Sequence, residues 1–447
     1  MLLVALLSAG MAGVLYRESE FRHGPVWATG TVAIMLITPL TIAMNSFFGA
    51  DALVSLLMFG AALAWSRYLT TGLDRHSAIF GLLAGLAILA KYNALALALL
   101  PPLSALLLRR GQLLRARSFW LPVPIVLAVA GPWYLLAWNM VVYASDMGDT
   151  PVSALTSANE YLTVLVERFG LPILTAAALG LARAMRRTGQ HPADVALGAF
   201  VASLLIFHSA IYPFAQDRYL YAAVPAMALL CVSGLRWVAA TLETRRRPMA
   251  AVAMLAIAVP GAWGPRGFST APPVEPASPA TLTEVADAMR SGLDLPGQHV
   301  LISSSGVGEG AFIAAVAVAE RRPQTQIFRA SKVLSSSSWM NSGYRLLYAD
   351  SAAVERRLDE LRVTTIVLDN DPERVQNPHQ SLLSWMLLSG GGPWKLERTF
   401  NSAGPNGRER ITRVYQRSQI YRFPAQSIEL DMSYSLGRSI RASRSTR

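Results

Sequence analysis

Apolar runs long enough to cross a lipid bilayer follow one another through the first 264 residues. A bilayer core needs about 20 apolar residues per helix, and helices satisfy their own backbone hydrogen bonds in lipid. We therefore expect about ten spans, of which the two around Lys91 are the least clearly separated. The candidate spans are residues 1–16, 26–43, 52–68, 78–90, 92–108, 119–141, 170–184, 193–211, 219–238 and 249–264.

The composition of the chain changes at about Pro265. Charged residues make up only 15% of the sequence, against about a quarter in soluble proteins, and the shortfall lies in the first part. The pattern predicts a polytopic α-helical membrane protein with a C-terminal α/β soluble domain. We expect a transmembrane domain over residues 1–264, an α/β domain over 265–423 and a disordered, Ser- and Arg-rich tail over 424–447.

Strand and helix patterns alternate in the C-terminal domain. His299–Ser304 and Thr364–Leu368 read as strands, Glu309–Glu320 reads as a helix, and two further strands are expected near the end. The Gly306–Gly310 segment lacks the third-glycine spacing of a dinucleotide-binding loop, so a tight turn is preferred. Nothing in this domain identifies a catalyst, and we expect it to bind or dock an acceptor.

Basic residues gather in alternate loops between the apolar runs. The other loops hold mostly acidic residues, with Lys91, Arg168 and Arg218 among them. Because basic loops stay in the cytoplasm, the C-terminal domain is expected outside, and so is Met1. We expect a multi-pass protein of a bacterial inner membrane. The basic set is Arg17, Arg22, Arg67, Arg75, Arg109, Arg110, Arg115, Arg117, Arg183, Arg186, Arg187, Arg236, Arg245, Arg246 and Arg247.

Several classes of function are disfavoured by the same residues. The net charge of +12 comes from these short loops, which argues against a nucleic-acid partner. Cys231 is the one cysteine and excludes an intrachain disulfide. No HExxH, paired CxxC or GxSxG pattern occurs, so a zinc or serine hydrolase is not expected. A transporter fits less well, because no inverted repeat is visible.

Four segments in order carry a resemblance to a known group of enzymes. They are the Tyr16-Arg17 loop before Gly24, the stretch Pro39–Leu53, the run Gly81–Tyr92 and the run Asp217–Pro225. This ordered set resembles the GT-C superfamily of glycosyltransferases. The nearest families are those of protein O-mannosyltransferases, aminoarabinose transferases and rhizobial galacturonosyltransferases.

The resemblance implies an activity and its partners. Such enzymes take a sugar from a polyprenyl-phosphate donor and pass it to an envelope lipid, glycan or protein acceptor at the outer face of the bilayer. They also carry an N-terminal span and a large first outer loop with a catalytic acidic motif. This sequence begins after the position of that loop, so we expect missing upstream sequence. The alternative is a non-catalytic or truncated relative whose outer domain binds a glycan or a partner.

Two positions are expected to bind the donor phosphate. Lys91 interrupts an apolar run, and a charge at the middle of the bilayer costs about 2.5–3.5 kcal/mol. It is therefore either a phosphate ligand or a lysine at a helix end whose ammonium extends to the membrane surface. Arg218 and Tyr219 stand at the start of a span. The planar guanidinium of Arg218 suits phosphate because it can donate two hydrogen bonds at once. Alternatively, both residues anchor the helix at the depth of the lipid headgroups. Asp217 is a candidate ion-pair partner of Arg218.

Acidic and amide side chains complete the candidate site. Asp51 begins a span after a short outer loop; it is either a helix N-cap or a carboxylate that orients the acceptor or binds a divalent cation, and the resemblance favours a catalytic role. Asn45, Tyr92 and Glu160 are candidate substrate contacts; Glu160 lies in a loop that is alternatively an interfacial helix. His208, near a span end, is more in keeping with a satisfied polar group than with a catalyst. No metal-ligand set and no certain cofactor are expected.

Overall fold

The computed structural model divides into two compact units, which are described separately. The first comprises Met1–Leu136 and Val152–Val274, and the second Ala137–Pro151 and Glu275–Arg447. The structure describes residues 2–443 except 46–48, 139–152, 187–190, 212–215, 241–279, 293–298, 321–324, 338–343, 371–375, 391, 404–408, 419–426 and 433–437. The expected span over 249–264 therefore lies outside the described residues.

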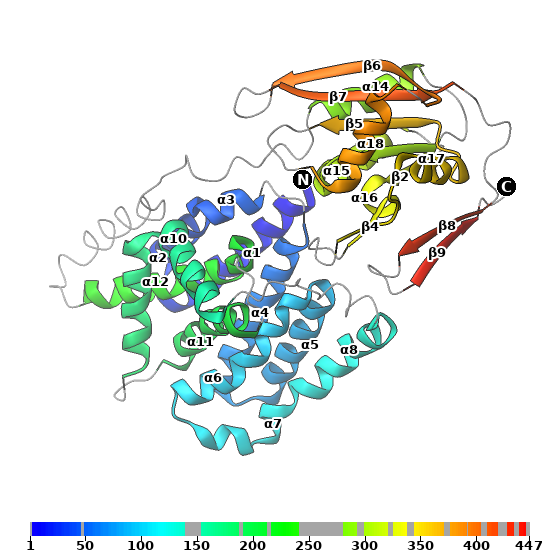
Figure 1. Cartoon of the computed structure of the whole chain (residues 1–447). Coiled ribbons are helices and arrows are strands. Elements are labelled where there is room, and N and C mark those ends of the chain that lie inside the picture. The colour runs from blue at the N-terminus through cyan, green and yellow to red at the C-terminus, as the bar shows by residue number, and fades with distance from the viewer. Residues whose placement is uncertain are drawn as a thin grey trace. The chain divides into compact units, whose positions relative to one another are not determined.

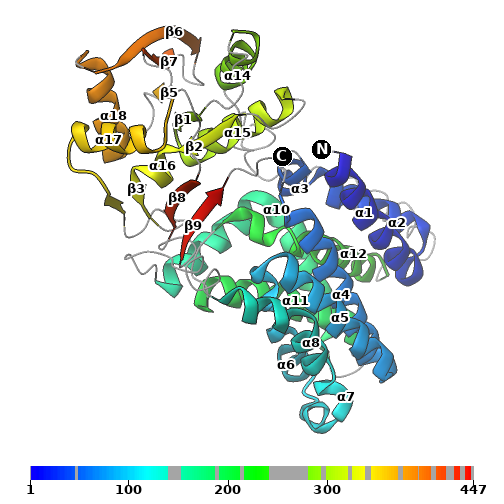
Figure 2. The same cartoon turned by 90° about the vertical axis from the view of Figure 1, so that its right-hand side faces the viewer.

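The first unit is a bundle of helices (Figure 1 and Figure 2). Six helices of the described residues are long and apolar enough to cross a membrane, or seven with one bent pair, which confirms the polytopic α-helical class. The helices are α1 (Leu2–His23), α2 (Pro25–Ile37), α3 (Pro39–Asn45), α4 (Asp51–Thr71), α5 (Asp74–Ala90), η1 (Tyr92–Leu99), α6 (Leu100–Leu107), η2 (Gly111–Arg115), α7 (Arg117–Trp120), α8 (Pro122–Leu136), α10 (Ala154–Ala184), α11 (Pro192–Ile206), η3 (Phe207–Ile211), η4 (Asp217–Leu220) and α12 (Ala223–Ala240).

Proline and glycine set the breaks in these helices. Helices α2 and α3 meet at a bend of 64°. Thr38 adopts an extended conformation at the bend because Pro39 disfavours a helical residue before it. Within α10, Gly170 has a φ of 75°, which glycine adopts without strain, and Pro172 follows. The segment from Ala154 to Gly170, expected as a loop or an interfacial helix, is the helical first half of α10.

Small residues let α10 and α12 pack at close range. A Cβ atom on Gly234 would overlap the backbone carbonyl oxygen of Ala176, and one on Gly180 would overlap that of Leu230. Without side chains between them the two backbones approach closely, as is usual for helices that pack in membranes. This crossing fixes α12, which begins just after the polar segment η4, against α10.

A buried ion-pair network ties helices together at one end of the bundle. Arg22 of α1 lies 2.7 Å from Glu18 and 2.9 Å from Asp194 of α11, and it also donates to Ser66 of α4. Ser66 follows Asp51 by fifteen residues, so this network lies about 22 Å along α4 from the start of that helix. The polar side chains of α4 are thus divided between its two ends.

The second unit is built on a mixed five-stranded sheet in the order β2-β1-β5-β7-β6. Strand β1 is parallel to β2 and β5, while β7 is antiparallel to β5 and β6. The expected strands over 299–304 and 364–368 correspond to β1 and β5, and the mixed sheet confirms an α/β domain. Its elements are α14 (Ala280–Gly292), β1 (His299–Ser303), α15 (Gly306–Ala319), β2 (Gln326–Arg329), α16 (Ala330–Val333), β3 (Ser335–Ser336), β4 (Arg345–Leu346), α17 (Ser351–Glu360), β5 (Thr365–Asn370), α18 (Pro378–Leu388), β6 (Trp394–Ala403) and β7 (Glu409–Arg417).

Helices cover both faces of this sheet. Because side chains alternate along a strand, Val300 and Ile302 of β1 pack with α14 and α15, while Leu301 packs with α16, α17 and α18. At the end of β1, Ser305 caps α15 by accepting a hydrogen bond from the Gly308 backbone N–H. A Cβ on Gly308 would overlap the Ser304 hydroxyl, which explains the glycine of this strand-to-helix turn.

The final residues differ from the expected disordered tail. Ser427–Met432 (β8) and Arg438–Ser443 (β9) pair as an antiparallel hairpin. The composition of this segment is polar, but apolar residues recur at every second position of β8, as in Ile428 and Leu430. That short alternation is typical of a strand, and a judgement from overall composition overlooks it.

Candidate functional site

An ion pair joins two of the expected site residues. Asp51 is the first residue of α4, and Lys91 lies in extended conformation at the junction of α5 and η1. The Lys91 Nζ atom lies 2.5 Å from Asp51 Oδ1, and the Asp51 residue is only 5% exposed. Lys91 therefore turns toward the buried carboxylate of α4, which is not the geometry of a lysine that snorkels into solvent.

The short helix η4 brings a second pair of charges to the same place. Asp217 pairs with Arg168 of α10, with an N–O distance of 2.6 Å. Arg218 instead donates a hydrogen bond from Nε to the Gln216 side chain. The interpretation of Asp217 as the ion-pair partner of Arg218 is therefore wrong, because Arg168 reaches that carboxylate from a helix remote in sequence.

Aromatic rings connect these charged groups. The Tyr219 ring centre lies 5.1 Å from the Lys91 ammonium and 5.6 Å from the Arg218 guanidinium, both at cation–π distance. His208 stacks on Tyr219 with a centroid distance of 4.5 Å and an interplanar angle of 9°. The Tyr161 hydroxyl accepts a hydrogen bond from the Gln216 backbone N–H at 3.2 Å, which anchors the start of η4.

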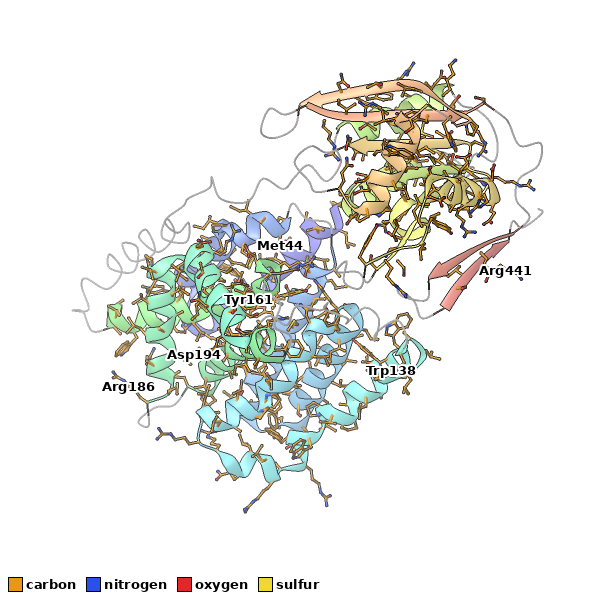
Figure 3. All side chains as sticks on the ribbon, in the orientation of Figure 1. Met44, Trp138, Tyr161, Arg186, Asp194 and Arg441 are labelled. Atoms are coloured by element: carbon orange, nitrogen blue, oxygen red, sulfur yellow. The ribbon has the colours of Figure 1, made fainter. Side chains whose placement is uncertain are left out.

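The structure thus brings Asp51, Lys91, Arg218 and Tyr219 together: both cations contact the Tyr219 ring, and Asp51 pairs with Lys91. Figure 3 shows Tyr161, which supports η4, within the helical bundle. The side chains that meet here come from five parts of the chain, namely α4, the α5–η1 junction, α10, η3 and η4. This cluster of Asp51, Lys91, Arg168, His208, Asp217, Arg218 and Tyr219 is called the polar cluster below.

The remaining candidate contacts lie at its margin or apart from it. Asn45 accepts a hydrogen bond from the Ser8 hydroxyl at 2.5 Å, and its helix α3 lies beside η4. Tyr92 directly follows Lys91 and is half-buried. Glu160 is exposed on α10, and within the described residues no ion pair or hydrogen bond joins it to the polar cluster. Asp146 and Asp149, which share with Glu160 the loop expected over residues 143–170, lie outside the described residues.

Arg168 and His208 of the polar cluster, and Tyr161 beside it, were not predicted from the sequence to belong to the donor-phosphate site. Arg168 breaks the inside bias of basic residues as Arg218 does, so the same signal identifies it. Tyr161 and His208 carry no such signal, because aromatic residues within apolar runs are common in membrane helices. The position of Tyr161 beside the cluster and of His208 within it depends on how α10 and η3 contact η4.

The charges of the polar cluster do not cancel. Lys91 is matched by Asp51 and Arg168 by Asp217, whereas among the described residues no carboxylate lies within ion-pair distance of Arg218. The three cations and two carboxylates leave a net charge of +1. In the described part of the chain no group of three His, Cys, Asp or Glu side chains is arranged to hold a metal ion.

An apolar pocket begins next to Lys91 in the sequence. Ile88 and Leu95, which flank Lys91 along the chain, line a pocket of about 310 Å³. It continues between α5, α6, α7 and α8, and its lining is almost entirely aliphatic and aromatic. The other lining residues are Phe80, Ala84, Leu97, Ala98, Pro101, Pro102, Leu114, Phe119, Trp120, Pro122, Val123, Val126 and Leu127.

Comparisons with known proteins match this architecture. A family model described as dolichyl-phosphate-mannose-protein mannosyltransferase matches residues 1–138. The crystal structure of ArnT from Cupriavidus metallidurans in the apo state is 15% identical, with 92% of this chain and 83% of that chain covered and a TM-score of 0.57. Its structure bound to undecaprenyl phosphate is 16% identical, with the same coverage and a TM-score of 0.53. No curated protein matches the chain.

Proposed function

Since the chain has the membrane-embedded fold of the GT-C superfamily of glycosyltransferases, we propose that it transfers a sugar from a polyprenyl-phosphate donor to an acceptor at the outer face of the membrane. In this proposal Lys91, Arg218 and Tyr219 bind the donor phosphate. The acceptor is an envelope lipid, glycan or protein, and the membrane is a bacterial inner membrane with the C-terminal domain on its outer side.

The observation that carries the proposal is the unmatched charge of Arg218. A phosphodiester between a sugar and a prenyl chain carries one negative charge, which the net +1 of the polar cluster complements. The guanidinium of Arg218 can donate paired hydrogen bonds to two phosphate oxygens. When the bond to the sugar breaks, the leaving phosphate gains a second negative charge, and cations fixed in a buried site stabilise that charge most strongly.

Asp51 is proposed to act on the acceptor side of the reaction. Its Oδ1 atom is engaged by Lys91 at 2.5 Å, which leaves Oδ2 to accept a hydrogen bond from an acceptor hydroxyl. A carboxylate in that position orients the nucleophile and accepts its proton as the new glycosidic bond forms. The ion pair also holds Lys91 above the Tyr219 ring, so Asp51 supports both halves of the site.

The apolar pocket supports a donor that carries a lipid tail. Its residues Ile88 and Leu95 lie within four positions of Lys91, so a molecule with its phosphate at Lys91 has apolar surface close by. The pocket lies between apolar helices, and its almost entirely apolar lining suits a hydrocarbon chain better than a polar ligand. ArnT of Cupriavidus metallidurans has been solved with undecaprenyl phosphate, a ligand that combines these two features.

The proposal is tested by measuring the binding of undecaprenyl phosphate to the purified full chain in lipid nanodiscs. Arg218→Ala removes the unmatched cation and is expected to weaken binding by about tenfold or more, because a hydrogen bond to a charged group contributes about 1.5–3 kcal/mol. Arg186→Ala is the matched control, since Arg186 is an exposed arginine that stacks on Trp237 and lies at the edge of the bundle in Figure 3.

Two outcomes would change the conclusion. Equal affinity of the Arg218→Ala and Arg186→Ala proteins for the lipid would remove the donor-site assignment. Normal lipid binding without sugar transfer from any polyprenyl-phosphate sugar supplied, to lipid, glycan or peptide acceptors, would favour the non-catalytic alternative.

A further inference from the structure

His208 lies in a wide helical turn that directs it toward the polar cluster. Helix α11 ends at Ile206, and Phe207–Ile211 continues as a π-helical turn. Such turns interrupt the regular ladder of hydrogen bonds and occur frequently at functional sites. His208 is fully buried, so its imidazole is held among neighbouring side chains and does not face the surroundings of the bundle.

The imidazole contacts the cluster through the face of its ring. It lies parallel to the Tyr219 ring at 4.5 Å, and the Tyr161 ring lies on another side at 6.1 Å. Tyr161 in turn holds the backbone of Gln216 at the start of η4. The His208 ring therefore covers one face of the Tyr219 ring and restricts its rotation, while Tyr161 packs against His208.

The orientation of Tyr219 matters because two cations rest against it. Lys91 and Arg218 both lie within cation–π distance of the ring, and this attraction requires the ring face to be presented to the cation. A Tyr219 ring free to rotate would present its edge, which carries partial positive charge and repels cations. The stacking partner of Tyr219 thus influences where both cations stand.

We propose that His208 is a positioning residue of the donor site, which acts by stacking on Tyr219 and so holding Lys91 and Arg218 in place to receive the phosphate. The inference rests on the proposed function and extends it to a residue with no expected contact to the sugar. The role belongs to the flat ring, so another planar ring of similar size can fulfil it. A role as proton donor or acceptor would require the imidazole nitrogens.

The experiment compares His208→Phe, His208→Leu and His208→Ala in the full chain, with undecaprenyl phosphate binding and steady-state transfer as readouts. Phe keeps the stack and is expected to bind within about threefold of the unmodified protein. Leu and Ala lose it and are expected to bind about fivefold more weakly, because an aromatic pair contributes about 0.5–1.5 kcal/mol. The loss should raise KM for the donor more than it lowers kcat.

The variants separate this inference from its alternatives. If His208→Ala does not accumulate as a folded protein, His208→Leu, which keeps most of the volume, decides the question. A His208→Phe protein as impaired as the Leu variant would show that the imidazole nitrogens matter and would overturn the stacking role, as would normal binding by the Leu variant. Failure of the unmodified protein to bind the lipid would overturn the proposed function and this inference together; failure of the stack alone would leave the Arg218→Ala effect intact.

Discussion

Separating the structural from the functional role of the Asp51–Lys91 pair gives the sharpest test of the site. Lys91→Met removes the ammonium but keeps an unbranched apolar stem, and it leaves the Asp51 carboxylate, 5% exposed, without its cation. Coulomb's law with an effective dielectric of about 20 gives an attraction of about 7 kcal/mol at the observed contact distance. Desolvation offsets part of this, and removal of one partner of a buried pair typically costs about 3–5 kcal/mol.

The corresponding loss of thermal stability is large enough to measure. For a unit of this size each 1 kcal/mol lowers the midpoint by about 2–4 °C, so a loss of 3 kcal/mol lowers the apparent midpoint of Lys91→Met by about 6–12 °C. Asp51→Asn combined with Lys91→Met removes both charges, and the double variant should recover most of that loss. The assay is thermal unfolding in detergent, followed by transfer and undecaprenyl phosphate binding on the same preparations.

Activity should not follow stability in this series. The double variant is expected to be nearly as stable as the unmodified protein and yet to bind the donor phosphate poorly, because the cation is still missing. Arg186→Ala again serves as the control for loss of a basic residue elsewhere. Undiminished stability of Lys91→Met would refute a buried ion pair, and normal lipid binding by the stable double variant would refute Lys91 as a phosphate ligand.

Three further predictions concern packing, a buried carboxylate and pH. Gly234→Ala should prevent accumulation of folded protein, measured by size-exclusion chromatography, because its methyl group would overlap the Ala176 carbonyl of α10. Asp369→Ala should destabilise the second unit by about 3–5 kcal/mol in hydrogen-exchange measurements, since the fully buried carboxylate pairs with Arg410 at 2.5 Å. Burial lowers the pKa of His379 to about 4 from its usual 6.5, so between these pH values the unfolded chain binds more protons than the folded one. The free energy of unfolding should therefore fall by about 2 kcal/mol from pH 6.5 to pH 5. The His379→Gln variant should not show this fall.

The sequence by itself determined the class of this protein. Long apolar runs in the first 264 residues predict membrane-spanning helices, because backbone polar groups cannot remain unpaired in lipid and a helix pairs them within the segment. The alternation of strands and helices after residue 299 fixes an α/β domain in the same way. Lys91 and Arg218 were also visible from sequence, because each is a cation where an apolar run or the charge bias of the loops does not favour one.

Tertiary structure decided how these residues are partnered. Asp217 stands next to Arg218 in the chain, yet it binds Arg168, which lies forty-nine residues earlier on α10. Lys91 finds Asp51 across forty positions, and His208 reaches Tyr219 through a π-helical turn that no local pattern predicts. Hydropathy and charge are properties of single positions and short windows, whereas an ion pair or a ring stack depends on how helices distant in sequence cross, which the packing of small residues such as Gly234 sets.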